Sequence, residues 1–228
     1  PVLDKEVARF REKKLMVERQ QGKRSFSPQL VGQILENRYK VIKSIDRGGM
    51  SFIYTAEDLG NNNTVVAVKV LISTLMHDDR LIRLFLKEGL IGRTLRHDNL
   101  VSVSDVGITP SGEPFVVMEY LEGECLGSRI IKRNYHVPIP ESKQIAIEVL
   151  KALAEAHENG IVHRDIRPEN IFLVRVADGI PPRVKLLDFG IARLMGEQPT
   201  ITGDIYGSPQ YMSPEQSFTE SDCDHRAD

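Results

Sequence analysis

The sequence of 228 residues is poor in cysteine and has no long apolar run. Cys125 and Cys223 are its only cysteines, too few for a disulfide framework or a structural zinc site, and this usage is typical of the reducing cytosol. No stretch approaches the roughly 18 apolar residues of a membrane span, and we find no signal peptide. We therefore expect these residues to form a cytoplasmic domain and to contain no membrane segment.

Neither sign of charge is in large excess, because 30 Lys and Arg stand against 32 Asp and Glu, for a formal net charge of -2. No global basic field favours nucleic acid as a partner, and no acidic excess favours disorder. A hydrophobic fraction of 41% is enough for a sizeable core. The length allows one compact domain or two small lobes.

Residues 1–36 have the character of an extension. Leu3, Val7, Phe10 and Val17 recur at helical spacing within a charged segment, and residues 22–28 are rich in linker residues. The thin apolar stripe fits a solvated helix with a narrow contact face. It also fits a regulatory or docking helix.

After residue 36 the pattern changes from strands to helices. Short β-branched runs at 39–45, 52–56, 65–71, 100–106 and 115–118 predict strands, interrupted by one helix at about 79–95. In that helix the predicted face carries Leu81, Leu84, Phe85, Glu88 and Ile91. After Pro140, a second helix is predicted to end near Gly160, with one face formed by Ile145, Val149, Leu150, Leu153 and His157.

Two features of the strand-rich part are compatible with nucleotide binding. Gly48 and Gly49 lie in a predicted turn at 46–51, where backbone amides could approach phosphate oxygens, although two glycines in a hairpin are also common in plain turns. Strand alternation places Ala67 and Lys69 on one face. A lone strand Lys is normally solvated, but Glu88 on the apolar helix needs a positive partner and could pair with it.

The most specific signal is the pair of motifs HRDIRPEN at residues 163–170 and DFG at 188–190, each beside an apolar strand-like run. Together with the glycine turn, Lys69 and Glu88, they resemble the signature set of the protein kinases. The resemblance covers residues 39–228. RGGM at 47–50 and YMSPEQ at 211–216 are similar to bacterial serine/threonine kinases.

The resemblance implies an α+β, two-lobed protein kinase fold. It predicts an N-terminal antiparallel sheet with one helix in residues 37–121, after the extension at 1–36, and a mostly helical, incomplete C-terminal lobe in residues 122–228. Asp228 is similar to the family's Asp that supports the catalytic loop from a central helix. Because the family's later helices are missing from these residues, we expect them alone to be poorly folded or inactive.

The resemblance also implies ATP and Mg²⁺ as cofactors. Lys69, fixed by Glu88, would hold the α- and β-phosphates, and Asn170 and Asp188 would bind Mg²⁺. Asp165 would accept the proton of the substrate hydroxyl, with Arg167 against the γ-phosphate. The predicted adenine contacts are the apolar walls Ile45, Ile53, Ala67 and Phe172, the back-pocket residue Met118, and the hinge residues Glu119 and Leu121.

Residues 188–215 resemble an activation segment, in which Thr200 and Thr202 are candidate phosphorylation sites with Arg164 as the docking partner. A flexible polar loop is the alternative interpretation of this segment. The sequence GSPQY at 207–211 resembles the substrate-positioning loop of serine/threonine kinases. Arg167 alone would favour a tyrosine kinase, because some tyrosine kinases carry Arg at this position. We give the GSPQY loop more weight and expect Ser and Thr hydroxyls of protein substrates as acceptors.

Three positions depart from the family pattern. Asp46 and Ser51 stand where glycines are usual, and Arg167 replaces a Lys, so reduced phosphoryl transfer is expected. A pseudokinase that binds nucleotide or a partner is the alternative function. A small-molecule phosphotransferase is a third, against which the long activation segment argues.

Overall fold

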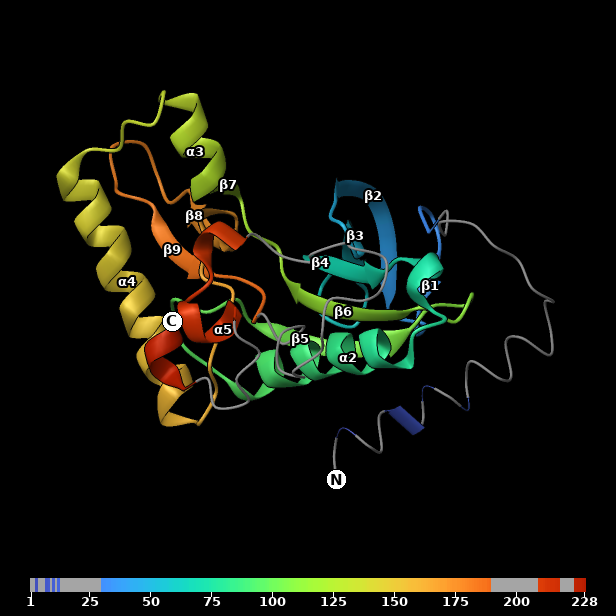
Figure 1. Ribbon diagram of the computed structural model, residues 1–228. Helices are drawn as coiled ribbons and strands as arrows, with labels where there is room; N and C mark the ends of the chain where they lie inside the picture. The colour runs from blue at the N-terminus through green and yellow to red at the C-terminus, as the bar shows by residue number, and fades with distance from the viewer. Residues whose placement is uncertain are drawn as a thin grey trace. The chain divides into compact units, whose positions relative to one another are not determined.

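The computed structural model describes Leu3, Val7, Ala8, Phe10, Glu12 and residues 30–189, 209–217 and 224–228. The chain divides into two compact units (Figure 1). The first comprises Pro1–Thr94 and Ser102–Tyr120, and the second comprises Leu95–Val101 and Leu121–Asp228. Within the described part of the chain, no helix is both long and apolar enough to cross a membrane.

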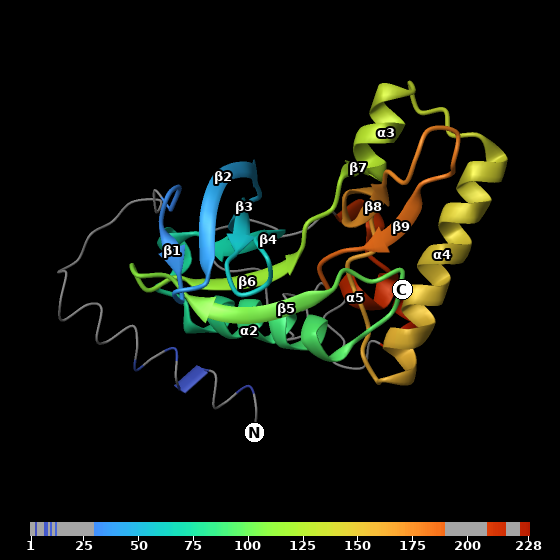
Figure 2. The ribbon, with the colours of Figure 1, turned by 180° about the vertical axis from the view of Figure 1, so that it is seen from behind.

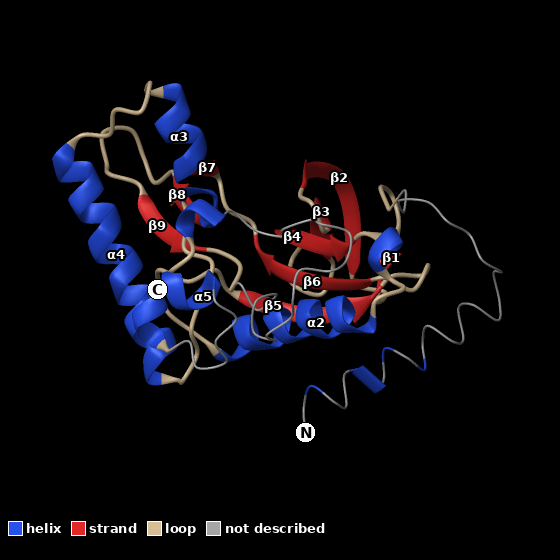
Figure 3. Ribbon diagram, in the orientation of Figure 1, coloured by secondary structure: helices blue, strands red, loops and turns tan. Residues whose placement is uncertain are grey.

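The first unit is an antiparallel sheet with one long helix. The sheet has the strand order β1-β2-β3-β4-β6-β5, and every neighbouring pair is antiparallel. Its strands are β1 (Ile34–Leu35), β2 (Tyr39–Arg47), β3 (Ser51–Asp58), β4 (Thr64–Leu71), β5 (Val103–Ile108) and β6 (Pro114–Glu119). The short helix η1 (Ser73–Leu75) leads into α2 (Asp79–Thr94), which runs along the sheet beside β5 and β6 (Figure 3).

Each face of this sheet has its own apolar cluster, because successive side chains of a strand point to opposite faces and both sets include apolar residues. On one face, side chains of β2, β3, β4 and β6 pack with Leu30 and Leu35. On the other face, Ile82, Phe85 and Leu86 of α2 pack against the sheet. Gly89 allows the close approach of α2, because a Cβ at this position would lie only 2.7 Å from Val116 Cγ2.

The N-terminal extension contributes to the cluster under α2. Val7 and Phe10 are 4% and 2% exposed and belong to that cluster, and Leu3 packs against it. The predicted apolar face is thereby confirmed for these three residues, whereas Val17 lies outside the described residues. The extension uses the face for packing within the first unit.

The second unit combines a small sheet with several helices. Its sheet has the antiparallel order β7-β8-β9, with β7 at Gly123–Cys125, β8 at Ile171–Val174 and β9 at Arg183–Leu186. Helix α4 packs against β9 (Figure 2). The helices are α3 (Leu126–Lys132), α4 (Ile139–Glu158), η2 (Pro168–Asn170), η4 (Pro209–Tyr211), α5 (Pro214–Ser217) and η5 (His225–Ala227).

The structure corrects two helix faces and one strand. Leu150 of α4 is 63% exposed, and the buried face passes through Ala152 and Ala156 instead. In α2 the buried face includes Ile82 and Leu86 in place of Leu81 and Ile91, since five of the residues at 81–86 are apolar and periodicity alone does not fix the rotation.

The strand predicted at 100–106 begins only at Val103. Leu100 and Val101 belong to the second unit, where Val101 N donates to Leu186 O at 3.0 Å and Leu100 O accepts from Lys185 Nζ at 3.0 Å. The apolar run at 100–106 is therefore divided between the two units, with residues 100–101 in the second and residues 102–106 in the first.

Candidate active site

The first unit joins Lys69 and Glu88 as the sequence predicts. Lys69 Nζ lies 2.6 Å from Glu88 Oε1, and the two side chains are only 11% and 25% exposed. Lys69 comes from β4 and Glu88 from α2, next to the close helix contact at Gly89. Burial of either charge alone would be costly, so each side chain stabilises the ionised form of the other.

Three other predicted residues share the sheet face of Lys69. Directly opposed residues in an antiparallel sheet point to the same side, and so do residues two apart on a strand. Ile53 pairs with Lys69, and Ala67 pairs with Met118. Ile53, Ala67, Lys69 and Met118 therefore form one continuous surface of the first unit.

Glu119 and Ile45 lie at the margins of this sheet. Glu119 is tied to Ser102 twice: its backbone N–H donates to Ser102 O at 2.9 Å, and its Oε1 accepts from Ser102 N at 2.7 Å. Ile45 lies in a register irregularity of β2 between Ser44 and Asp46 and is 43% exposed.

The glycine turn is shorter than predicted, because β2 extends to Arg47 and β3 begins at Ser51. Gly48 N donates to Ser51 O at 2.9 Å, and a Cβ at Gly49 would meet no atom within 4 Å. The absence of side chains leaves the backbone of the turn uncovered. Asp46 is exposed, and its Oδ1 accepts from the neighbouring Arg47 N at 2.7 Å.

The second unit gathers the residues of the catalytic motif. Asn170 is 6% exposed, and its Nδ2 donates to both Asp165 O at 2.9 Å and Asp165 Oδ2 at 2.8 Å. Arg167 Nε lies 3.3 Å from the same Oδ2 of Asp165. The Asp165 carboxylate is thus oriented by an amide and a guanidinium of its own loop.

Asp228 holds the backbone of that loop, as the resemblance implies. Its side chain is 0% exposed and accepts from His163 N at 2.7 Å, from Arg164 N at 2.6 Å and contacts His157 Nε2 at 2.8 Å. Arg164 has a φ of 66°, a left-handed conformation that is unfavourable for a side chain of this kind. The carboxylate of Asp228 stabilises this strained backbone.

His163 is a positioning residue that the sequence analysis included only as part of the motif. It is 0% exposed, its Nε2 lies 2.8 Å from Leu187 O, and its Nδ1 accepts from Asp165 N at 3.2 Å. Burial lowers the pKa of His163, and this effect outweighs the opposing influence of the Leu187 carbonyl and nearby carboxylates. The neutral ring therefore links the loop of Asp165 to the end of β9.

Asp188 follows that link directly. Leu187 N donates to Asn170 O at 2.8 Å, and Asp188 has a φ of 37°. The ring of Phe189 lies against His163, with 4.9 Å between ring centroids. The backbone bonds at Leu187 thereby fix Asp188 relative to Asn170.

The donor set fits Mg²⁺ better than an all-protein metal centre. Among the residues that the structure describes, no three His, Cys, Asp or Glu side chains gather as a metal site. Asn170 uses its amide nitrogen for Asp165, which leaves the amide oxygen for a ligand. Mg²⁺ prefers few protein oxygens together with phosphate and water, so an amide and a carboxylate suffice.

The remaining predicted residues are less constrained by the structure. Leu121 lies between β6 and β7, and Phe172 of β8 pairs with Cys125 and Lys185. Both belong to the second unit, whereas the other predicted adenine contacts belong to the first. The adenine site therefore stays a prediction. Thr200 and Thr202 lie outside the described residues.

Gln216 is a further contact of the catalytic loop, which the sequence analysis included only as part of the YMSPEQ motif. Its Nε2 donates to Arg164 O at 3.0 Å, and its Oε1 accepts from Ser213 N at 3.0 Å. This side chain attaches the SPEQ motif to the strained residue of the loop.

Comparison with known proteins identifies the family of the chain. The probable serine/threonine-protein kinase PknB of Lactococcus lactis is 38% identical over 188 residues, covering 82% of this chain and 29% of the relative. Serine/threonine-protein kinase pkn3 of Myxococcus xanthus is 39% identical over 205 residues, covering 87% and 36%. The chain therefore spans roughly a third of the length of these relatives.

A crystal structure of the PknI kinase domain of Mycobacterium tuberculosis matches with a TM-score of 0.68 at 29% identity, covering 87% of this chain and 70% of that one. The family model of the protein kinase domain matches residues 39–228. With these matches, the two-lobed kinase fold is confirmed, and the chain belongs to the protein kinase family.

Proposed function

We propose that this chain carries the catalytic residues for Mg²⁺-dependent transfer of the γ-phosphoryl group of ATP to Ser or Thr hydroxyls of protein substrates. The observation that carries the proposal is the arrangement around Asp165, whose carboxylate is oriented by Asn170 while Asp228 holds the adjacent backbone. The names of the curated relatives support the choice of Ser and Thr.

Asp165 orients the attacking hydroxyl and accepts its proton. A general base must lie within hydrogen-bond reach of that proton, which requires a fixed carboxylate. Arg167, 3.3 Å from Asp165 Oδ2, adds a positive charge beside the carboxylate. Its remaining guanidinium N–H groups are suited to a transferring phosphoryl group.

Lys69 binds phosphate oxygens, and Glu88 keeps its ammonium on the correct side of β4. The uncovered backbone at Gly48 and Gly49 lets phosphate approach the turn, and Gly49 N–H is the proposed donor because Gly48 N–H is bonded to Ser51 O. Asp46 does not oppose this binding in the observed rotamer, because its carboxylate turns back onto Arg47 N. Ile45, Ile53, Ala67, Met118, Glu119, Leu121 and Phe172 remain the proposed adenine contacts.

Asn170 and Asp188 would provide the hard oxygen ligands for the metal. Mg²⁺ held there would supply neutralisation of the charge on the phosphates. The bond from Leu187 N to Asn170 O keeps these two ligands in register. Thr200 and Thr202 are proposed phosphorylation sites that would regulate the loop through added negative charge.

The experiment compares the full-length protein with its Asp165→Asn variant in a phosphoryl-transfer assay on a Ser/Thr peptide, with ATP binding measured in parallel. Removal of the base should lower kcat by about 10²-fold or more while ATP binding is kept. Asp98→Asn is the matched control, since Asp98 is an exposed carboxylate of the same unit. ATP binding without transfer by the unsubstituted protein would favour the pseudokinase alternative instead.

A further inference from the structure

The second unit contains a pocket of about 250 Å³. It lies at the end of β8, the strand that directly follows the catalytic loop. Its walls come from β7, α3 and the connection between β8 and β9. The residues that define its chemistry are Glu124, Arg129, Lys132, Arg175, Val176 and Ile180. None of them takes part in the proposed phosphoryl transfer.

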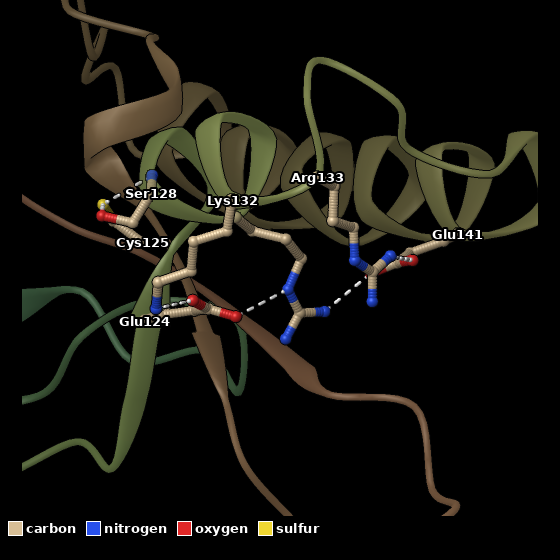
Figure 4. A network of polar contacts seen from close by, with 7 residues as sticks. Glu124, Cys125, Ser128, Lys132, Arg133 and Glu141 are labelled. Carbon is tan, nitrogen blue, oxygen red and sulfur yellow. Dashed lines mark hydrogen bonds and ion pairs between the residues drawn. The ribbon is translucent and has the colours of Figure 1, made fainter.

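Glu124, Arg129 and Lys132 of the pocket lining belong to an ion-pair network, which Figure 4 shows from close by. Glu124 accepts from Arg129 Nε at 3.0 Å and from Lys132 Nζ at 2.8 Å. Arg129 also donates to Glu141 Oε1 at 2.6 Å, and Arg133 donates to the other oxygen of Glu141 at 2.6 Å. The two carboxylates thus hold α3 and its cations in place.

The charge balance of the lining itself is positive, because Arg129, Lys132 and Arg175 stand against Glu124 alone. Hydrogen bonds from Lys132 lower the pKa of Glu124, and those from Arg129 add to the effect, so this carboxylate is ionised near neutral pH. The exposed side chain of Arg175 contacts no partner among the residues that the structure describes. Arg175 is therefore available to an incoming anion.

The other side of the pocket is aliphatic. Val176 and Ile180 are 51% and 55% exposed, so the pocket presents apolar surface to solvent. Gly123 belongs to the same lining and has a φ of 157°. A Cβ at this position would lie only 2.0 Å from Leu173 O. Any side chain at this position would displace β8, so the floor of the pocket is fixed by backbone.

The position of the pocket relates it to the catalytic loop within the same unit. Asn170 directly precedes β8 and Arg175 directly follows it. Four strand residues span about 13 Å. A peptide bound at the pocket would be held roughly one short extended segment away from Asp165, which raises its effective concentration there.

We propose that this pocket is a docking site for an acidic segment with an aliphatic side chain in protein substrates. A carboxylate of the segment pairs with Arg175 and Lys132, and its aliphatic side chain packs on Val176 and Ile180. The role in substrate choice rests on the proposed function, whereas the binding itself does not. The neighbouring aliphatic residues favour a peptide over nucleic acid, which would need a longer row of cations.

The test uses the full-length protein and the fluorescein-labelled peptide Glu-Asp-Leu-Glu-Leu, with Lys-Lys-Leu-Lys-Leu as the charge-reversed reference. Fluorescence anisotropy should show binding of the acidic peptide only, with at least a tenfold higher Kd for Arg175→Glu and for Ile180→Asp. Lys151→Glu is the control, because Lys151 is an exposed residue of α4 outside the pocket. Equal binding by the Arg175→Glu variant, or complete displacement of the peptide by inorganic phosphate at equal concentration, would overturn the proposal.

A second measurement separates docking from catalysis. A Ser/Thr substrate fused to the acidic segment should lose at least tenfold in kcat/KM with the Arg175→Glu variant, while a short substrate without the segment keeps its rate. Equal losses for both substrates would contradict docking. Peptide binding without phosphorylation of either substrate by the unsubstituted protein would refute the proposed function and leave the docking site in place.

Discussion

Replacement of Asp228 by Asn should disorder the catalytic loop without touching any residue that contacts substrate. The carboxylate is buried and accepts two backbone N–H groups, at 2.7 Å from His163 and at 2.6 Å from Arg164. Hydrogen bonds to a charged group contribute about 1.5–3 kcal/mol each. Asn keeps one acceptor oxygen and turns an NH₂ group toward the other donor.

We therefore expect a cost of about 2–3 kcal/mol to the ordered loop, because one charged bond is lost and the other becomes neutral. This cost corresponds to roughly a 30- to 150-fold fall in the equilibrium constant between the ordered and the disordered loop, at about 1.4 kcal/mol for each factor of ten. Since the substitution leaves Lys69 and Glu88 unchanged, ATP affinity should fall less than kcat.

Two measurements on the full-length protein check this expectation. Hydrogen exchange at the amides of His163 and Arg164 should accelerate by roughly that factor, and kcat should fall by at most the same factor. Asp224→Asn is a matched control: Asp224 is a capping residue of η5 that accepts from Arg226 N at 2.9 Å, and Asn caps helices equally well. Unchanged exchange at these two amides would refute the idea that Asp228 orders the loop.

Three further predictions concern other parts of the molecule. Burial lowers the pKa of His163 in the folded state, so its contribution to stability is complete above the unfolded pKa of about 6.5 and is lost as pH falls. The loss at pH 5.5 is at most about 1.4 kcal/mol. In thermal melts, the loss of stability between pH 7.5 and pH 5.5 should be smaller for His163→Gln than for the unsubstituted protein. An equal loss of stability in both proteins would contradict this. Phe10→Ala should speed proteolysis of the N-terminal extension, because Phe10 is 2% exposed under α2, whereas Glu12→Ala at an exposed position should not. Arg167→Lys should raise kcat a few-fold by replacing the planar fork beside Asp165 with the compact ammonium, and an unchanged or lower kcat would exclude this explanation.

The sequence predicted the parts of the site that are chemically specific. Lys69 and Glu88 are paired as expected, and Asp165 and Asn170 lie together because they share one loop. The contact from Asp228 to Arg164 joins residues 64 positions apart, and only the family resemblance indicated it. Spacing within a local window contains no information on contacts of this kind.

Packing details were less predictable for physical reasons. A run of apolar residues shows that a segment is buried, but not where a strand begins. The strand predicted at 100–106 therefore includes Leu100, which instead forms an isolated bridge with Leu186. Gln216 belongs to the YMSPEQ motif, but the motif does not indicate that its amide donates to Arg164 O. Such residues become visible only when the backbone they attach to is known.

The strained residues of the second unit show why these attachments matter for the site. Arg164 and Asp188 have φ values of 66° and 37°, and left-handed backbone costs roughly 1–2 kcal/mol at each such residue. Asp228 restrains the first, and the bond from Leu187 N to Asn170 O restrains the segment before the second. His163 connects the two, because its ring contacts Leu187 O and accepts from Asp165 N. Since these bonds form one network, loss of any member should release the same strain, and the effects of combined substitutions at His163 and Asp228 should be smaller than the sum of the single effects.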